Sequence, residues 1–521
     1  MQHQTVVILD YGSQYTQLIT RRVRELGIFS VILPANVKLE RILSYHPKAV
    51  ILSGGPSSVY DRGAPVLPEG FLKQQALVKI PVLGICYGMQ LLGKELGGSV
   101  EGAHTREYGR MGVKALVEGS KLLPSASFQA WMSHGDELKI LPPGFTATAR
   151  SESGALAAIE NDSARIYAIQ FHPEVSHTEN GKELLRKFLT EIAAIKPDWN
   201  MDSVLDEQIE IICSKVGPTD HVICGLSGGV DSTVAATLVH RAIGDRLHCI
   251  FVDHGLLRFE EQSRVMQMFK EELHLPVECI DASKVFLDKL AGVSDPEQKR
   301  KIIGAEFIAV FNQAANGLVK KLGQKPKYLV QGTLYPDVIE SSPGHLSAAT
   351  IKSHHNVGGL PKELGFELIE PLRALFKDEV RELGLVLKVP ARFIKRHPFP
   401  GPGLAVRIIG DITQARLDLL KQVDEVFITS IQEAGLYDQI WQAFAVFLPV
   451  KSVGVQGDGR THDHVVALRA VTSTDGMTAD WFHFDSRFLA SVSAKICNQV
   501  RGVNRVVYDI SSKPPATIEW E

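Results

Sequence analysis

Residues 81–98 read PVLGICYGMQLLGKELGG, and this stretch decides the fold class of the first part of the chain. The apolar run at 81–85 predicts a short buried strand, and 89–96 predicts a helix that ends at two glycines. Between them, GICYG at 84–88 predicts a sharp turn, the cysteine counterpart of a G-x-S-x-G nucleophile elbow. Backbone N–H groups at a helix N-terminus stabilise a thiolate, so the turn favours a nucleophilic Cys86.

The same rhythm of a short apolar run followed by a longer amphipathic stretch repeats through the first three quarters of the chain. It is typical of α/β domains with largely parallel sheets, and two such sheets fit the pattern better than one. The predicted strands lie at 6–9, 49–52, 81–85, 221–226, 248–252 and 328–330.

Two stretches interrupt this rhythm and predict domain boundaries. Residues 194–200 carry a proline between two helical patterns, and HPFPGPG at 397–403 forbids a regular element. At ~100 to 200 residues per domain, a chain of 521 residues is expected to hold about three domains. We therefore predict two doubly wound, mainly parallel-sheet α/β domains at 1–198 and 199–396, followed by a smaller α+β domain at 397–521.

Composition excludes several classes of protein. The chain has 56 Lys and Arg against 59 Asp and Glu, a formal net charge of -3, which lacks the basic excess of a nucleic-acid-binding protein. Its six cysteines are dispersed, with no C-x-x-C pair and no zinc-like spacing. The N-terminus lacks the pattern of a signal peptide, and no apolar run is expected to reach the ~20 residues of a membrane helix. We expect a cytoplasmic protein that binds neither membrane nor nucleic acid.

Two further strand ends carry groups that a cysteine nucleophile needs. The predicted strand at 166–171 leads into His172-Pro-Glu174, where a carboxylate two residues beyond the histidine could hold the imidazole in the right tautomer. Ser53-Gly-Gly-Pro56 follows another strand and offers backbone N–H groups to an oxyanion. A buried structural cysteine is the alternative for Cys86 alone, but the three motifs together favour catalysis.

In these motifs the chain resembles the class I glutamine amidotransferases over roughly residues 5–197. The resemblance implies that Cys86 is the nucleophile that forms a thioester with glutamine, that His172 is the base and that Glu174 orients it. It further implies oxyanion N–H groups from Gly55 and Tyr87.

The same resemblance places Gln90 and the Ser133-His-Gly-Asp136 loop near the bound glutamine. For Gln90 a solvent-facing helical position is an equally weighted alternative.

The second site lies at residues 227–232, SGGVDS, between the predicted strand at 221–226 and a helix at 233–243. Glycines and hydroxyl side chains at a helix N-terminus can wrap a phosphate chain. A Walker A loop is excluded because no lysine precedes the final hydroxyl residue. The segment resembles the PP-motif of N-type ATP pyrophosphatases. The resemblance implies that ATP is bound by Ser227, Gly228, Gly229, Val230, Asp231, Ser232 and Thr233.

Within this loop Asp231 is expected to position Mg²⁺; the alternative is an ordinary acidic residue in the first turn of a helix. The next strand ends at Asp253 and His254, where we favour adenosine recognition over a loop cap. The cationic run that begins at Lys299 is typical of a solvated helix face.

A glutaminase domain joined to an ATP pyrophosphatase domain predicts an amination in two steps. ATP adenylylates an oxygen of the substrate, and ammonia then displaces AMP from the carbon that carries this oxygen. The ending KPPATIEWE at 513–521, with residues 397–403 and the Arg300 region, resembles the GMP synthetase family along the whole chain. The resemblance implies that XMP is the substrate and that the C-terminal domain forms a homodimer. It also implies XMP contacts from Arg300, Gln442, Lys513 and Glu519.

Arg and Lys suit a phosphomonoester, and an acid can accept hydrogen bonds from ring N–H or ribose hydroxyl groups. The alternatives for these residues are surface salt bridges and a frayed tail.

Three other functions are compatible with parts of this pattern. Another glutamine-dependent synthetase with the same two modules, such as an NAD synthetase, is disfavoured by the tail. A tRNA-modifying PP-motif enzyme is disfavoured by the net charge and the dispersed cysteines. A non-enzymatic scaffold is disfavoured by the intact nucleophile, base and phosphate loop.

Overall fold

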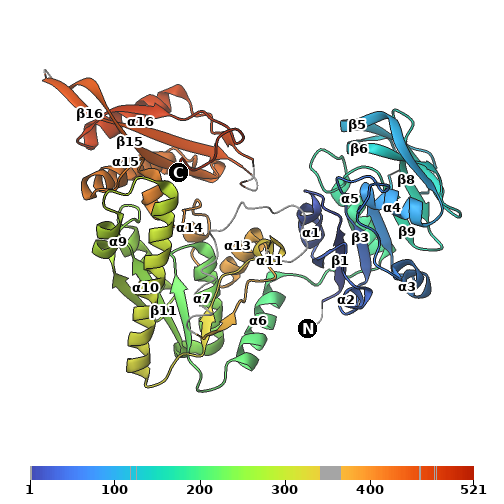
Figure 1. Cartoon of the computed structure of the whole chain (residues 1–521), viewed down its shortest axis with the longest axis horizontal. Helices are drawn as coiled ribbons and strands as arrows, with labels where there is room; N and C mark the ends of the chain where they lie inside the picture. The colour runs from blue at the N-terminus through green and yellow to red at the C-terminus, as the bar shows by residue number, and fades with distance from the viewer. Residues whose placement is uncertain are drawn as a thin grey trace. The chain divides into compact units, whose positions relative to one another are not determined.

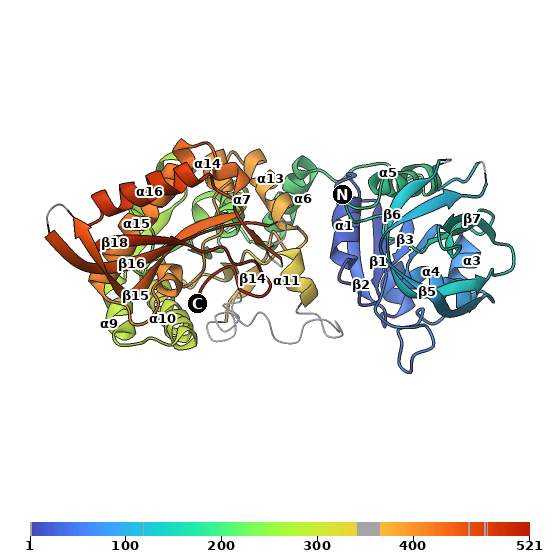
Figure 2. The same ribbon diagram turned by 90° about the horizontal axis from the view of Figure 1, so that it is seen from above.

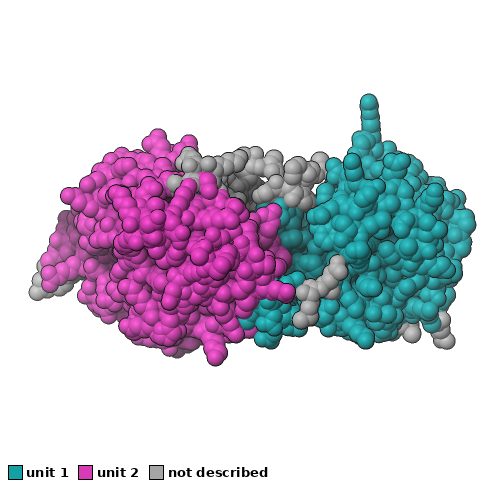
Figure 3. All heavy atoms as spheres, turned by 90° about the horizontal axis from the view of Figure 1, so that it is seen from below, with its two compact units in different colours: residues 1–207, 335–351 teal, residues 208–334, 352–521 magenta. Residues whose placement is uncertain are grey.

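A computed structural model gives the fold and describes residues 3–117, 119–124, 126–340, 365–456, 459–473, 476 and 478–521. The chain divides into two compact units, one of residues 1–207 with 335–351 and the other of residues 208–334 with 352–521 (Figure 3). Both are mixed α/β structures with large sheets, which confirms the coarse fold prediction.

Unit 1 is built on a nine-stranded sheet in the order β2-β1-β3-β4-β9-β8-β7-β5-β6. The strands from β2 to β9 pair in parallel, and the central ones are short and wholly buried because helices cover both faces. The sheet comprises β1 (Thr5–Asp10), β2 (Phe29–Pro34), β3 (Ala49–Leu52), β4 (Val82–Ile85), β5 (Ser99–Ala115), β6 (Phe128–Ile140), β7 (Thr146–Ser151), β8 (Leu156–Asn161) and β9 (Ile166–Ile169).

The strands from β8 to β6 pair antiparallel, and the sequence pattern did not predict this extension. The reason is local: β6 alternates buried with exposed or half-buried residues over most of its length, so it lacks the continuous apolar run that marked the other strands.

The helices of unit 1 are α1 (Thr16–Arg24), α2 (Leu39–Leu43), α3 (Phe71–Val78), α4 (Tyr87–Glu95), α5 (Gly181–Arg186), its continuation η1 (Lys187–Ile192) and α11 (Tyr335–Glu340); α6 (Met201–Lys215) crosses the division between the units (Figure 1). The core packs β1, β2, β3 and β4 against apolar residues of α2, α3 and α4. This packing fixes the turn between β4 and α4, where Cys86 lies.

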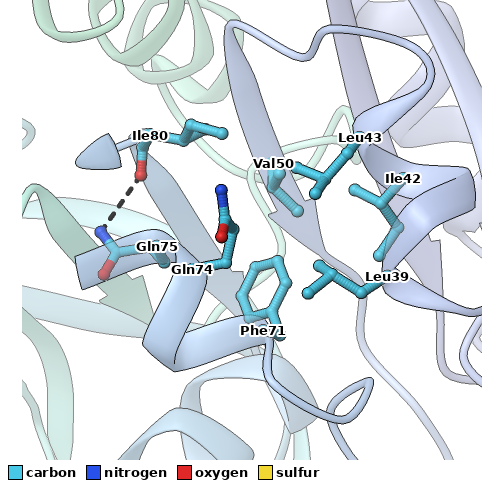
Figure 4. A pocket seen from close by; sticks show the side chains of 8 residues that line it. All are labelled: Leu39, Ile42, Leu43, Val50, Phe71, Gln74, Gln75 and Ile80. Carbon is cyan, nitrogen blue, oxygen red and sulfur yellow. Dashed lines mark hydrogen bonds between the residues drawn. The ribbon is translucent and has the colours of Figure 1, made fainter. Parts of the chain in front are cut away.

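A cavity of about 10 Å³ lies where α2 and α3 pack on β3 (Figure 4). Gln75 closes one side by donating from Nε2 to the Ile80 carbonyl at 3.2 Å. The volume has room for about one water molecule at most, so the cavity is a packing defect rather than a ligand site. Its lining residues are Leu39, Ile42, Leu43, Val50, Phe71, Gln74, Gln75 and Ile80.

Unit 2 holds a five-stranded, wholly parallel sheet in the order β12-β11-β10-β13-β14. Its strands are β10 (Val222–Leu226), β11 (Leu247–Asp253), β12 (Val277–Asp281), β13 (Tyr328–Val330) and β14 (Glu367–Ile369). The helical segments around it are α7 (Val230–Ile243), η2 (Gly244–Arg246), α8 (Glu261–Gln267), η3 (Met268–Glu272), α9 (Ser283–Leu290), α10 (Pro296–Leu322), α13 (Lys377–Val386) and α14 (Ala391–Ile394). The predicted strands at 221–226, 248–252 and 328–330 are confirmed.

Among the described residues, α10 is one helix whose length and apolar composition would allow it to cross a membrane. The sequence pattern led us to expect no such run. The same test is passed by core helices, and α10 buries Ile303, Val310, Phe311 and Ala315 in the core of unit 2.

The last part of unit 2 is a second, smaller sheet in which β16 pairs antiparallel with β15 and β17 and in parallel with β18. Its elements are η4 (Gly403–Arg407), α15 (Gln414–Glu433), η5 (Tyr437–Gln439), β15 (Gln442–Gln456), β16 (Gly459–Thr472), β17 (Asp480–Trp481), α16 (Ser486–Gln499) and β18 (Val503–Tyr508).

Alternate residues of β15 face opposite sides of this sheet. Ala443, Ala445 and Phe447 join the core beneath α15 and α16, whereas Phe444 packs with Ile518 of the C-terminal tail. The helices α15 and α16 therefore cover one face of the sheet (Figure 2), and the tail covers part of the other.

Candidate active sites

The turn between β4 and α4 has the backbone of a nucleophile elbow. Cys86 has a φ of 52°, a left-handed value that a non-glycine residue adopts at a cost of about 1 to 3 kcal/mol. A Cβ on Gly84 would lie 2.7 Å from the Gly88 carbonyl oxygen, and one on Gly88 would lie 2.6 Å from the Leu52 carbonyl oxygen. Both glycines are therefore required by close backbone contacts, and the strain falls on the cysteine between them.

The structure brings Cys86, His172 and Glu174 together, as the motifs predict. His172 Nδ1 and Glu174 Oε1 lie 2.7 Å apart, and all three residues are buried. Burial lowers the pKa of His172, but the negative charge of Glu174 and hydrogen bonding to Cys86 outweigh it and raise this pKa well above 6.5. The histidine is thus placed to hold a proton beside the sulfur.

The strand end at residues 53–55 lies against the same turn and the triad histidine. A Cβ on Gly54 would lie 3.6 Å from Cys86 Cβ and 3.0 Å from His172 Cε1. A Cβ on Gly55 would lie 3.3 Å from Tyr87 Cγ and 2.6 Å from the Tyr11 carbonyl oxygen. Only glycine fits at this distance, and the backbones of the two predicted oxyanion residues are brought close to the nucleophile.

Gln90 is buried, so the solvent-facing alternative is wrong. Its Nε2 donates to the Asp136 carbonyl at 2.9 Å and approaches Gln170 Oε1 at 3.3 Å. The Cys86 thiol points at the Ser133 carbonyl oxygen, 3.6 Å away. The 133–136 segment therefore lies beside the nucleophile, as predicted, but it is part of strand β6 and not a loop.

In unit 2 the phosphate-loop motif forms the turn from β10 into α7. Gly228 has a φ of +74°, and Gly229 is the N-cap of α7. Ser227 and Ser232 approach each other at 3.0 Å between their Oγ atoms, and the Gly229 amide donates to Ser227 Oγ at 3.2 Å. Hydroxyl groups and helix N-terminal amides thus converge at this turn, an arrangement that is able to bind phosphate.

Asp231, the predicted Mg²⁺ ligand, forms an ion pair with Lys377 of α13. Lys377 Nζ lies 2.6 Å from both carboxylate oxygens. Mg²⁺ is often held by one or two carboxylates together with substrate phosphates, so a single carboxylate beside the β10–α7 turn fits an ion that arrives with ATP. No group of three or more candidate metal ligands occurs among the described residues, so a preformed protein cage is absent from that part of the chain.

At the end of β11, Asp253 and His254 make the contacts of a loop cap. Asp253 Oδ1 accepts from the Gly255 amide at 2.8 Å, and His254 Nδ1 accepts from the Leu256 amide at 3.0 Å. Burial lowers the pKa of His254 to about 4, which keeps the imidazole neutral. Adenosine recognition by these residues stays a prediction.

Two of the predicted XMP contacts meet directly. Gln442 Nε2 donates to Glu519 Oε1 at 2.7 Å. The same carboxylate accepts two hydrogen bonds from Arg407, whose Nη2 and Nε donate at 2.9 and 3.1 Å. Arg407 is fully buried, with its guanidinium 4.2 Å from the ring centroid of Phe444.

Arg300 and Lys513 contact other parts of the tail region. Arg300 Nη2 donates to the Glu521 carbonyl at 2.6 Å, and Lys513 Nζ donates to the Gly476 carbonyl at 2.8 Å. Lys299 is fully buried and bonds the Glu521 carboxylate, so the solvated helix face expected there is wrong for this residue.

The tail is held rather than frayed. Arg469, also fully buried, donates to the Ser511, Thr517 and Ile518 carbonyls at 2.6, 3.1 and 3.2 Å.

Three cations beside the sites were not found by sequence reasoning. Lys377 and Arg407 lie outside every motif, and Lys299 was read as a surface residue. The sequence offers one signal for a buried Lys299: its spacing from Ile303 places both residues on the same face of a helix. The neighbouring cations favour the opposite interpretation, a face exposed to solvent.

The fold and these sites define a class I glutamine amidotransferase joined to an ATP pyrophosphatase. Residues 7–192 match the family described as glutamine amidotransferase class-I, residues 204–333 match NAD synthase, and residues 429–520 match the GMP synthase C terminal domain.

Full-length relatives narrow the class. Glutamine-hydrolysing GMP synthase of Brachyspira hyodysenteriae is 55% identical, with 99% of both chains covered. The enzyme of Nitrobacter hamburgensis is 54% identical, with 100% of this chain and 96% of that chain covered. The enzyme of Chlorobium phaeobacteroides is 55% identical, with 99% of this chain and 100% of that chain covered. The chain belongs to the glutamine-hydrolysing GMP synthase family. It is accordingly an ATP-dependent ligase that uses glutamine as its nitrogen donor and XMP as acceptor.

Proposed function

We propose that Cys86, His172 and Glu174 carry out the glutaminase half of the reaction. His172 takes the thiol proton, the thiolate adds to the side-chain amide carbon of glutamine, and ammonia leaves with a proton from the imidazolium. Water then hydrolyses the thioester to glutamate. The observation that carries this proposal is geometric: Glu174 Oε1 lies 2.7 Å from His172 Nδ1, beside a cysteine in a strained elbow. The charge of Glu174 raises the pKa of His172, as a proton acceptor for the thiol requires.

Gly55 and Tyr87 supply backbone N–H groups to the oxyanion that forms at each addition step. Gly55 suits this role because its backbone approaches the turn more closely than any residue with a side chain could. The fixed geometry requires no rearrangement when charge develops.

In unit 2 we propose that residues 227–233 hold the β and γ phosphates of ATP. An oxygen on the purine ring of XMP attacks the α phosphorus and diphosphate leaves; ammonia then adds to the ring carbon, and AMP leaves with that oxygen. The products are GMP, AMP, diphosphate and glutamate. Mg²⁺ bound with ATP would be held by Asp231 and would neutralise phosphate charge.

Lys377 is placed to assist in the same site. Its ammonium is bound to Asp231 in this structure, 2.6 Å from both oxygens, and can turn to a phosphate oxygen when nucleotide enters. The helix N-terminus of α7 and Lys377 together supply the positive field that diphosphate needs as a leaving group.

XMP is proposed to bind along the C-terminal tail. Glu519 keeps unused acceptor capacity after binding Arg407 and Gln442, which suits a ring N–H or a ribose hydroxyl group. Arg300 and Lys513 supply positive charge for the phosphate. In this proposal Gln442 acts partly through Glu519, to which it is already bonded.

A turnover assay tests the acceptor. The purified chain is given ATP, glutamine and either XMP or deamido-NAD, and release of AMP is measured together with the aminated product. We expect GMP and AMP in equal amounts with XMP, and background with deamido-NAD. AMP release with deamido-NAD and none with XMP would overturn the proposal and support the NAD synthetase alternative.

We further propose that the chain is a cytoplasmic homodimer organised as domains at 1–198, 199–396 and 397–521, with two doubly wound domains and a C-terminal dimerisation domain. Support for a dimer comes from exposed apolar side chains at Val450, Val453 and Val455 on the β15–β16 hairpin. Sedimentation equilibrium with wild type and Val455→Lys tests it. A monomeric wild type contradicts the dimer, and an unaltered dimer in the variant contradicts this surface.

A further inference from the structure

A buried carboxylate–histidine pair lies beside the glutaminase site: Glu107 belongs to none of the predicted motifs, and His134 belongs to the 133–136 segment. Glu107 on β5 and His134 on β6 face each other in the register of the sheet. Their side chains are 0% and 1% exposed, and the nitrogen Nε2 of the histidine lies 2.8 Å from Glu107 Oε2. Burying polar and ionisable groups is costly unless each finds hydrogen-bond partners.

Both nitrogens of His134 face acceptors. Nε2 meets the carboxylate of Glu107, and Nδ1 lies 2.9 Å from the Asp136 carbonyl oxygen. A carbonyl oxygen cannot donate, and an ionised carboxylate cannot either, so a ring nitrogen that bonds either acceptor must carry the hydrogen. His134 therefore connects a fixed anion in the sheet to the backbone of the 133–136 segment.

Glu107 is held as an anion by three donors. Ser151 Oγ donates to Oε1 at 2.6 Å, Ser153 Oγ donates to the same oxygen, and His134 donates to the other. Burial raises the pKa of Glu107, but these hydrogen bonds outweigh it and lower this pKa to about 2. The anion is thus anchored from the last residue of β7, Ser151, and from Ser153 in the turn that follows.

The segment that His134 holds borders the nucleophile. The Asp136 carbonyl accepts from Gln90 Nε2 as well as from His134, and the Ser133 carbonyl oxygen lies 3.6 Å from Cys86 Sγ. Residues 133–136 are therefore fixed from two sides, by α4 and by the buried pair. Apolar residues of similar size at these two positions would often leave a protein core equally stable. Stability alone therefore does not account for the pair.

We propose that Glu107 and His134 are positioning residues that fix the 133–136 segment for binding of the glutamine substrate. This inference rests on the proposed role of Cys86 as the glutaminase nucleophile. The pair touches neither the thiol nor the triad histidine among the described contacts. It is thus expected to act on glutamine binding and not on the reactivity of the thiol.

The test separates binding from thiol chemistry in the full-length chain. Glu107→Gln keeps the shape of the side chain and removes its charge. We expect kcat/KM for glutamine to fall about 10- to 100-fold, mostly through KM, as a small displacement of a positioning group produces. GMP formation with ammonium chloride should be unchanged, which also reports that the variant is folded.

Chemical labelling gives a second readout. A diazoketone analogue of glutamine should alkylate Cys86 more slowly in Glu107→Gln, whereas iodoacetamide, which needs no amino-acid site, should alkylate it at the wild-type rate. Labelling is followed by mass spectrometry of the Cys86 peptide, because Cys213 is exposed and also reacts.

Glu160→Gln is the matched control, since Glu160 is a buried carboxylate of the same sheet that also accepts from a serine, Ser120. It should leave the glutamine KM unchanged. His134→Gln should resemble Glu107→Gln, and the double variant should be no worse than either single one if the two residues act as a unit.

Each contrary result has a distinct meaning. A wild-type glutamine KM in Glu107→Gln overturns the inference, and so does an equal fall in the iodoacetamide rate, which would place the pair in thiol chemistry. If Cys86→Ala kept glutaminase activity, the proposed function itself would fail, independently of the behaviour of Glu107→Gln.

Discussion

Replacing Arg407 by lysine is expected to weaken XMP binding while sparing glutamine hydrolysis. Arg407 holds both carboxylate oxygens of Glu519, at 2.9 and 3.1 Å, and is itself fully buried against Phe444. Lysine keeps the positive charge but cannot form the planar two-point contact. The carboxylate of Glu519 would then be held in its present orientation mainly by Gln442, through one hydrogen bond to Oε1.

The size of the effect follows from the bonds that are lost. One of the two charge-assisted hydrogen bonds contributes about 1.5 to 3 kcal/mol. Since each 1.4 kcal/mol is tenfold in an equilibrium constant, an XMP site that depends on Glu519 should weaken roughly 10- to 100-fold. Lost stacking on Phe444 acts in the same direction.

The assay measures initial rates of GMP formation with ammonium chloride as nitrogen donor, saturating ATP and varied XMP. Glu519→Gln is run beside Arg407→Lys. Arg416→Lys is the matched control, because Arg416 also lies over an aromatic ring, Phe447, but pairs with Asp411 instead of the tail. A wild-type XMP KM in Arg407→Lys, with a raised one in Glu519→Gln, would refute the positioning of Glu519 by Arg407.

Three further changes test the catalytic groups and the elbow. Lys377→Met should lower glutamine- and ammonia-driven GMP formation alike by about 10²-fold or more, as loss of a phosphate-binding charge does; a normal ammonia-driven rate would exclude a role in the ATP site. Glu174→Gln should lower the glutaminase kcat by on the order of 10²- to 10⁴-fold with the ammonia reaction intact. Because the pKa of His172 is raised above 6.5, protonated His172 contributes its full stabilisation below pH 6.5, and this contribution is lost as pH rises through the raised pKa. The difference in unfolding free energy between wild type and Glu174→Gln, measured by chemical unfolding, should therefore become smaller as pH rises. A difference that does not change with pH would contradict the pairing of His172 with Glu174. Gly88→Ala should lower the unfolding free energy by about 1 to 3 kcal/mol in a urea titration, since its Cβ would lie 2.6 Å from a carbonyl oxygen, while Gly102→Ala, which meets nothing within 4 Å, should not.

The sequence was most informative where local chemistry and local structure coincide. The apolar strands that lead into Ser53, Cys86 and His172 were predictable because parallel strands buried on both faces have continuous apolar runs. Their carboxyl ends meet at one edge of the sheet, which explains why three motifs far apart in the chain form one site. The phosphate loop was predictable for the same reason.

Contacts between distant segments were beyond the reach of the pattern. Glu107 and His134 lie in long strands with mixed burial, and nothing in either strand alone indicates that their side chains pair. Arg407 and Lys299 are charged residues of a kind that usually lies on the surface. Each is nevertheless fully buried and forms an ion pair with an acidic residue of the tail. Such pairs become visible only when tertiary structure brings the partner.

The most direct test of the two-site scheme is the nitrogen donor that Cys86→Ala can use. GMP formation is measured with XMP and ATP, once with glutamine and once with ammonium chloride, in wild type and variant. We expect the variant to lose the glutamine-dependent reaction and to keep the ammonia-dependent reaction at the wild-type rate. Loss of both reactions in a protein that is still folded would contradict the division of labour between the two sites.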